Sequence, residues 1–147
     1  MDERGLQCSL SGRILAWGTV NLLLDTHVLI WLSLTPERLS ERVTDLLMDE
    51  TNLWFLSLAS VWEMQIKRQL GKLSLNLPLP ELIASQQQTN GLQLLPIELN
   101  HIFTLENLPQ FHRDPFDRLL IAQAITEQIP LLSIDTVFDH YPVQRLW

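Results

Sequence analysis

Cysteine is nearly absent from this sequence, because Cys8 is the only one among its 147 residues. A single thiol cannot form an internal disulfide, and no Cys/His cluster has the spacing of a structural zinc site. These two absences argue against a disulfide-stapled secreted domain and against a zinc module. They favour a protein of a reducing compartment, and we expect a cytoplasmic location.

Positive charge is also scarce, with 10 Lys and Arg against 17 Asp and Glu and a formal net charge of -7. The composition therefore predicts no long-range attraction to nucleic acid. Half of the basic residues nevertheless stand beside two acids: Lys67, Arg68 and Lys72 follow Glu63, while Arg113 and Arg118 flank Asp117. This clustering has two interpretations, local ion pairs between helical neighbours or contacts with phosphate groups, and the sequence leaves both open.

Long hydrophobic runs are missing as well. The most apolar stretch near the N-terminus, Ile14–Leu24, is interrupted by Gly18, Thr19 and Asn21, so we expect no membrane span. Residues 1–20 show little periodicity, and we interpret them as an N-terminal extension, either flexible or the product of a misassigned start. Residues 21–147 have the length of one domain.

The apolar residues of this domain gather in short runs that have the length of buried strands. The clearest runs are Asn21–Leu24, Leu53–Leu56, Leu92–Ile97 and Pro130–Ile134. Helical patterns separate them, at Thr26–Leu34, Ser40–Glu50, Val61–Leu70, Glu81–Thr89, Leu99–Leu105 and Pro115–Gln128, and the last residues offer a short helix and an edge strand. Alternation of strands and helices favours an α/β domain with a mostly parallel sheet and helices on both faces.

Four acids stand where these strands and helices meet: Asp25, Glu63, Asp117 and Asp135. In an open parallel sheet, sites form outside the carboxyl ends of the strands, near the point where the strand order reverses. Each acid also has a structural explanation. Asp25 and Asp135 could cap the next helix, Glu63 could close a capping box with Ser60, and Asp117 could stabilise a first helical turn.

Convergence of the four acids favours a shared site over separate helix caps. Four separate junctions each place a carboxylate at the same predicted edge of the sheet, which chance does less often. Neighbouring carboxylates repel by roughly 1 kcal/mol per pair in water and by about 4 kcal/mol at an effective dielectric of 20. A divalent cation or a shifted protonation state must offset that repulsion. Because all-oxygen ligand sets suit Mg²⁺ or Mn²⁺ rather than zinc, we predict a site for one of these ions.

The same acids lie in four segments that resemble a known family. These segments are Leu22-Leu-Leu-Asp25-Thr-His27, Ser57-Leu-Ala-Ser-Val-Trp-Glu63, His112-Arg-Asp-Pro-Phe-Asp117-Arg-Leu-Leu120 and Leu131-Leu-Ser-Ile-Asp135. In order and spacing they resemble PIN domains, and among these the VapC-type toxins of bacterial type II toxin–antitoxin systems. The resemblance extends from Asn21 to the C-terminus, and the residues before it depart from the pattern.

The resemblance implies a three-layer α/β/α fold, a Mg²⁺- or Mn²⁺-dependent endoribonuclease activity, a homodimer, and inhibition by a cognate antitoxin. The residues that match the family's four acidic positions are Asp25, Glu63, Asp117 and Asp135, with Thr26 and Ser133 where hydroxyl groups support the site. Asp114 fits the pattern too, but we interpret it as a helix N-cap because Pro115 follows it. We expect Lys67, Lys72, Arg113 and Arg118 to hold RNA phosphates, and His112 to be a solvated loop residue.

Two other functions are consistent with the sequence. An aspartate-based phosphohydrolase or receiver-like domain also carries an acid after its first strand. It would need a second acid where His27 stands, or a late lysine, and no lysine follows Lys72. The second alternative is a non-enzymatic interaction module whose acids only cap helices, and it predicts neither metal-dependent stabilisation nor nuclease activity.

Overall fold

The computed structural model describes residues 19–147. The predicted N-terminal extension therefore lies outside the described residues, apart from its last two. The described strands are β1 (Asn21–Leu24), β2 (Leu53–Ser57), β3 (Gln93–Leu95), β4 (Leu131–Leu132) and β5 (Arg145–Leu146). The α-helices are α1 (Thr26–Leu34), α2 (Glu41–Met48), α3 (Leu58–Gln69), α4 (Leu79–Asn90), α5 (Leu99–Thr104) and α6 (Pro115–Glu127). The 3-10 helices within residues 19–147 are η3 (Pro36–Arg38), η4 (Leu105–Asn107) and η5 (Thr136–His140).

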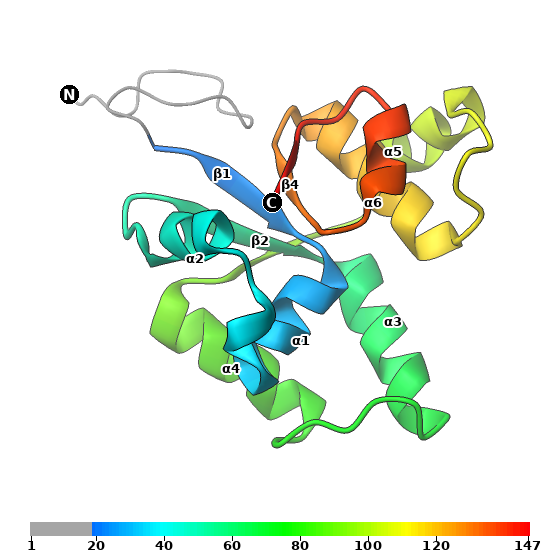
Figure 1. Cartoon of the computed structure of the whole chain (residues 1–147). Coiled ribbons are helices and arrows are strands. Elements are labelled where there is room, and N and C mark those ends of the chain that lie inside the picture. The colour runs from blue at the N-terminus through cyan, green and yellow to red at the C-terminus, as the bar shows by residue number, and fades with distance from the viewer. Residues whose placement is uncertain (1–18) are drawn as a thin grey trace.

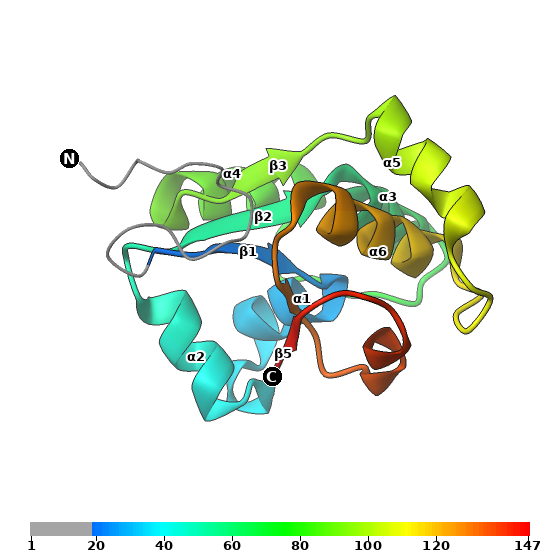
Figure 2. The same cartoon turned by 90° about the horizontal axis from the view of Figure 1, so that it is seen from above.

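The strands form one sheet in the order β3-β2-β1-β4-β5, and every neighbouring pair is parallel. Figure 2 shows β3, β2 and β1 side by side. The predicted parallel sheet and the C-terminal edge strand are thus confirmed. Two strands are shorter than predicted. β3 ends before Pro96, which has no N–H to continue the ladder, and β4 keeps only Leu131 and Leu132.

Hydrophobic cores cover both faces of the sheet, which makes three layers. Side chains alternate along a strand, so Leu22 and Leu24 of β1 enter one core while Leu23 enters the other. The first core is completed by α1 to α4 and the second by α6 with the chain around η4 and η5. Figure 1 shows α1 to α4 on one side of β1 and β2, and α5 and α6 on the other. This arrangement confirms the α/β/α prediction and explains why the strands read as unbroken apolar runs.

No helix among residues 19–147 combines the length and the apolar character that crossing a bilayer requires. Helices α1, α3 and α6 all begin at the same end of the sheet.

Candidate functional site

The strand order reverses between β1 and β4. From β1 the chain moves outward to β2 and β3, then returns to place β4 on the other side of β1. The carboxyl ends of these two strands are joined by a hydrogen bond of 3.0 Å from the Asp25 amide N–H to the Leu132 carbonyl. Such a reversal point is where open α/β sheets form their binding crevices.

Asp25 is 5% exposed and lies directly after β1. It occupies the N-cap position of α1, but its side chain makes no capping hydrogen bond. Its Oδ2 atom instead accepts a hydrogen bond of 2.7 Å from the hydroxyl of Ser133, which follows β4. The helix-cap explanation is therefore wrong for the Asp25 carboxylate, which Ser133 holds across the reversal point.

Glu63 is buried in α3 and belongs to no capping box, so that interpretation is also wrong. The helix begins one turn earlier than predicted, because the Ser57 hydroxyl caps it by accepting the Ala59 N–H at 3.0 Å. The two carboxylate oxygens of Glu63 have separate partners: the Thr26 hydroxyl donates to Oε1 and the Lys67 ammonium to Oε2, each at 2.9 Å. Thr26 thereby links the start of α1 to this acid.

Asp117 and Asp135 lie near Asp25 and Glu63, at the starts of α6 and η5. The predicted N-cap at Asp114 is confirmed, since its Oδ1 accepts the N–H groups of Phe116 and Asp117 at 2.8 and 3.2 Å. Asp135 does cap η5, through a bond of 3.0 Å from the Val137 N–H to its Oδ1. Asp135 also lines a cleft with the other three acids, so one carboxylate both caps a helix and contributes to the site.

His112 lies inside this group of acids, contrary to the prediction that it is solvated. Its side chain is 15% exposed, and its Nε2 lies 2.9 Å from Asp117 Oδ2 and 3.4 Å from Asp135 Oδ2. Among the described residues, Nε2 is nevertheless a buried atom that forms no hydrogen bond. Neither short distance is thus accompanied by a ring N–H that points at the oxygen.

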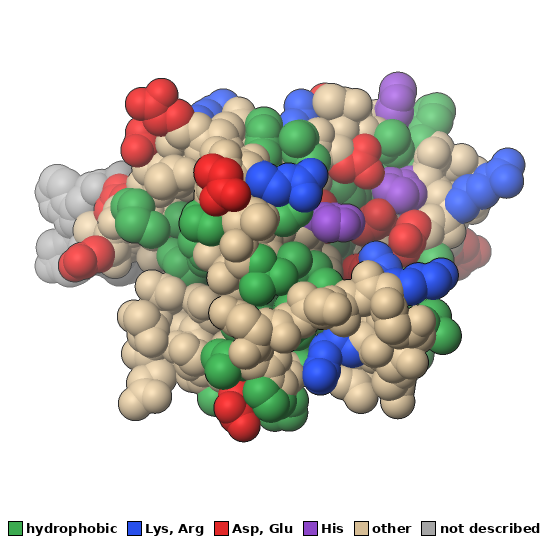
Figure 3. All heavy atoms as spheres, turned by 60° about the horizontal axis from the view of Figure 1, so that its bottom comes forward, with side chains coloured by type: hydrophobic (Ala, Val, Ile, Leu, Met, Phe, Trp, Pro, Cys, Tyr) green, Lys and Arg blue, Asp and Glu red, His purple; other side chains and the backbone are tan. Residues whose placement is uncertain are grey.

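All four predicted acids line one cleft of about 350 Å³, which we call the acid cleft. Its lining residues are Asp25, His27, Trp31, Glu63, Lys67, Asp114, Asp117, Ile134 and Asp135. On the face shown in Figure 3, acidic and histidine side chains gather at a hollow, with basic side chains beside it. The acids come from four different junctions, so the convergence predicted from the strand pattern exists in the fold.

Burial and mutual repulsion raise the pKa of two of these acids. The pKa of Asp117 rises to about 8, mainly because the carboxyl group is buried and also because Asp25, Asp114, Glu63 and Asp135 carry like charges. Burial raises the pKa of Asp25 as well, while the hydrogen bond from Ser133 opposes that rise. A group of carboxylates under this strain is a suitable ligand set for a hard divalent cation, and the residues present fit Mg²⁺ or Mn²⁺.

The four predicted phosphate-binding residues differ in their surroundings. Lys67 is half-buried in its ion pair with Glu63, whose hydrogen bond raises the lysine pKa. Lys72 and Arg113 are exposed. Arg118 is engaged with the protein itself, because its guanidinium donates to the carbonyls of Leu105, Leu108, Pro109 and His112. Its environment is therefore that of a residue that fixes the loop before α6.

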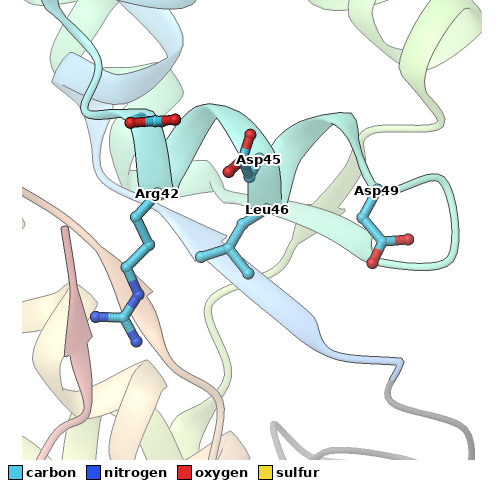
Figure 4. A pocket seen from close by; sticks show the side chains of 5 residues that line it. Arg42, Asp45, Leu46 and Asp49 are labelled. Atoms are coloured by element: carbon cyan, nitrogen blue, oxygen red, sulfur yellow. The ribbon is translucent and has the colours of Figure 1, made fainter.

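A larger hollow, of about 470 Å³, runs along α2 and is lined by Glu41, Arg42, Asp45, Leu46 and Asp49. All five residues belong to one helix and its C-cap. In Figure 4 the labelled side chains are spread along the helix and do not converge on one point. The hollow brings together no groups from separate elements, and we do not take it as the site.

Residues 22–144 match the family model of the PIN domain. This chain belongs to the PIN domain family. The acid cleft therefore lies in a PIN domain, with all four of its acids inside the matched range. Among curated proteins, none is significantly similar to the sequence.

Solved structures with the same fold include VapBC2 from Rickettsia felis bound to a DNA fragment from its promoter. It has a TM-score of 0.66 and 15% identity, over 86% of this chain and 98% of that one. FitAcB from Neisseria gonorrhoeae has a TM-score of 0.59 and 20% identity, over 86% and 96%. DNA-bound VapBC from Salmonella typhimurium has a TM-score of 0.60 and 13% identity, also over 86% and 96%. At these identities the likeness concerns the fold alone.

Proposed function

We propose that this PIN domain is a Mg²⁺- or Mn²⁺-dependent endoribonuclease, and that it acts as the toxin of a toxin–antitoxin pair. The observation that supports this best is the gathering of Asp25, Glu63, Asp117 and Asp135 from four junctions in one cleft. Helix capping alone does not account for it, because neither the Asp25 nor the Glu63 carboxylate caps a helix.

The proposed reaction is hydrolysis of an RNA phosphodiester by water. A divalent cation would lower the pKa of a water molecule and neutralise charge on the scissile phosphate and the leaving oxygen. When a cation is bound, Asp25, fixed by Ser133, would hold it together with Asp117 and Asp135. Glu63, held by Thr26 and Lys67, is placed to orient the attacking water and accept its proton.

Three basic residues, Lys67, Lys72 and Arg113, would hold the flanking phosphates of the RNA. Arg113 stands four residues before Asp117, and Lys72 follows the end of α3. Lys67 lines the cleft itself. Arg118 is not among these residues, because its guanidinium already donates to four backbone carbonyl groups. Phosphate contacts position a nucleic acid without reading its sequence, so these residues imply no particular RNA target.

The proposed partners are an antitoxin and a second copy of the chain. They follow from the resemblance to VapC-type toxins and agree with the solved VapBC and FitAcB structures, which have this fold. Exposed apolar side chains near the acid cleft offer a surface for such partners: Trp62 is 60% exposed and its ring meets Phe116 edge to face, with centroids 5.3 Å apart.

Induction in a bacterial host tests the proposed toxin activity. Wild-type protein should arrest growth and create new RNA ends, whereas Asp117→Asn should do neither, because a carboxylate of the cleft is lost. Asp45→Asn is the matched control, since Asp45 is an exposed acid of the α2 hollow and should leave arrest and cleavage intact. Arrest by Asp117→Asn, or arrest by wild type without new RNA ends, would contradict the proposal.

A further inference from the structure

Two carboxylates of the acid cleft, those of Asp117 and Asp135, lie against the imidazole of His112, a potential metal ligand beside the cleft. We infer that His112 is a nitrogen ligand of the divalent cation and makes the site select Mn²⁺ over Mg²⁺. This inference rests on the proposed metal site and refines it, because the sequence pattern predicted a ligand set made of oxygen alone.

The distances around His112 Nε2 are those of atoms that share a cation. Two adjacent ligand atoms about 2.1 Å from an octahedrally coordinated ion lie about 3.0 Å apart. The Nε2 atom is 2.9 Å from Asp117 Oδ2 and 3.4 Å from Asp135 Oδ2. One ligand atom from each of these three residues lies within 4.8 Å of the other two.

The bonding of His112 separates it from a histidine that only supports the fold. His101 provides the comparison, since it is fully buried beside Glu98 and Glu127. Both of its ring nitrogens have partners: Nδ1 accepts the Glu98 N–H at 3.0 Å, and Nε2 lies 2.8 Å from Glu127 Oε2 in a hydrogen bond. The Nε2 atom of His112 is buried without any hydrogen bond, although two carboxylates stand within reach. A buried polar atom in that condition calls for a further partner.

The fold holds His112 in place from both sides. Its backbone N–H donates to the Tyr141 hydroxyl at 2.8 Å, and the same hydroxyl donates to the Pro109 carbonyl at 2.9 Å. Its carbonyl accepts a bond of 3.3 Å from the Arg118 guanidinium, and its ring packs against Phe138 with centroids 5.6 Å apart. These contacts fix the backbone and the ring of His112 beside Asp117 and Asp135.

A nitrogen ligand changes which cation the acid cleft prefers. Mg²⁺ takes oxygen ligands and keeps several waters, whereas imidazole suits transition metals. With Asp117 and Asp135 beside His112, the mixed nitrogen and oxygen set favours Mn²⁺ among the two ions expected here. Loss of the imidazole should therefore weaken Mn²⁺ binding and leave Mg²⁺ binding nearly unchanged.

Pulsed electron paramagnetic resonance of the Mn²⁺-loaded full chain tests this directly, because a ligating imidazole nitrogen modulates the electron spin echo. We expect nitrogen modulation in wild type, in His27→Gln and in His140→Gln, and its loss in His112→Gln. His27 is the essential control because it is the histidine among the residues that line the cleft. Persistence of the modulation in His112→Gln, or its loss in His27→Gln, would overturn the inference.

Calorimetry of metal binding gives a second readout that needs no RNA. His112→Gln should lower the affinity for Mn²⁺ by about tenfold or more and change that for Mg²⁺ by less than about threefold. Equal losses for the two ions would overturn the inference. If His112→Gln does not fold, the double variant His27→Gln/His140→Gln replaces it. Its nitrogen modulation can come only from His112, since both nitrogens of His101, the one other histidine, are engaged.

The outcomes for metal binding and for nuclease activity are separable. A protein that binds Mn²⁺ with nitrogen modulation but leaves RNA intact would contradict the proposed function and support the inference. A protein that cuts RNA with Mn²⁺ but shows no nitrogen modulation would contradict the inference alone.

Discussion

Asp25→Asn should cleave single-stranded RNA at least about a thousandfold more slowly than wild type at saturating Mn²⁺. Each 1.36 kcal/mol of lost transition-state stabilisation slows a reaction tenfold, and a bound cation supplies several kcal/mol. The asparagine keeps an oxygen that can accept the Ser133 hydroxyl bond, so the fold should persist. Rates of cleavage of a labelled RNA, measured with excess enzyme, give the comparison.

Ser133→Ala tests the hydrogen bond that positions Asp25 independently of the Asp25 carboxylate itself. It removes the bond of 2.7 Å that fixes Asp25 but leaves the carboxylate, so it should slow cleavage by less than Asp25→Asn does. Circular dichroism and the unfolding midpoint establish that each variant is folded. Cleavage by folded Asp25→Asn at a rate within tenfold of wild type would remove Asp25 from the metal site.

Asp117→Asn should stabilise the metal-free protein at alkaline pH. Folding raises the pKa of Asp117 from 3.8 to about 8, so the folded state favours the protonated carboxyl group. The stability that this group contributes is fully present below about pH 4 and is lost as the pH rises through about 8. Asparagine resembles the neutral acid at every pH. In the presence of a chelator at pH 9, the variant should therefore unfold at least about 4 °C above wild type.

Two comparisons check the cause of that gain. Near pH 4 the two proteins should unfold at similar temperatures, since Asp117 is then protonated in wild type too. Added Mn²⁺ at pH 9 should stabilise wild type more than Asp117→Asn, because the ion binds the ionised carboxylate. An alkaline unfolding temperature of the variant at or below that of wild type would show that Asp117 is not strained in the folded state.

The firmest sequence predictions were those that local pattern determines. Leu22, Leu23 and Leu24 are apolar on both faces, as a strand between two helical layers must be, and the next residue then lies at the carboxyl end of a central strand. The Asp-Pro pair at Asp114 likewise fixed the start of α6 through cap chemistry that needs no distant partner. Asp25 and Asp117 could be placed at one sheet edge for these reasons.

The sequence predictions that were wrong, for Glu63 and His112, concern residues whose surroundings local sequence pattern does not determine. Both Ser57 and Ser60 have N-cap chemistry, but α3 follows β2 without an intervening loop, so Ser57 is the residue that caps it. This early start places Ser60 inside the helix and made the Glu63 capping box wrong. His112 lies in a segment without periodicity, and a hydroxyl from Tyr141, 29 residues later, holds it against the acids. The helpful signal was its position five residues before Asp117 in a segment that also contains Arg118 and Asp114.

Anomalous X-ray diffraction from Mn²⁺-soaked crystals tests the central claim most directly, because it locates the cation among named carboxylates. We expect a peak in the acid cleft within ligand distance, about 2.2 Å, of oxygens from Asp25 and from Asp117 or Asp135. Asp25→Asn crystals treated in the same way should show that peak weakened or lost. A wild-type structure at saturating Mn²⁺ with no peak in the cleft, or with a peak only at exposed acids such as Asp45, would contradict it.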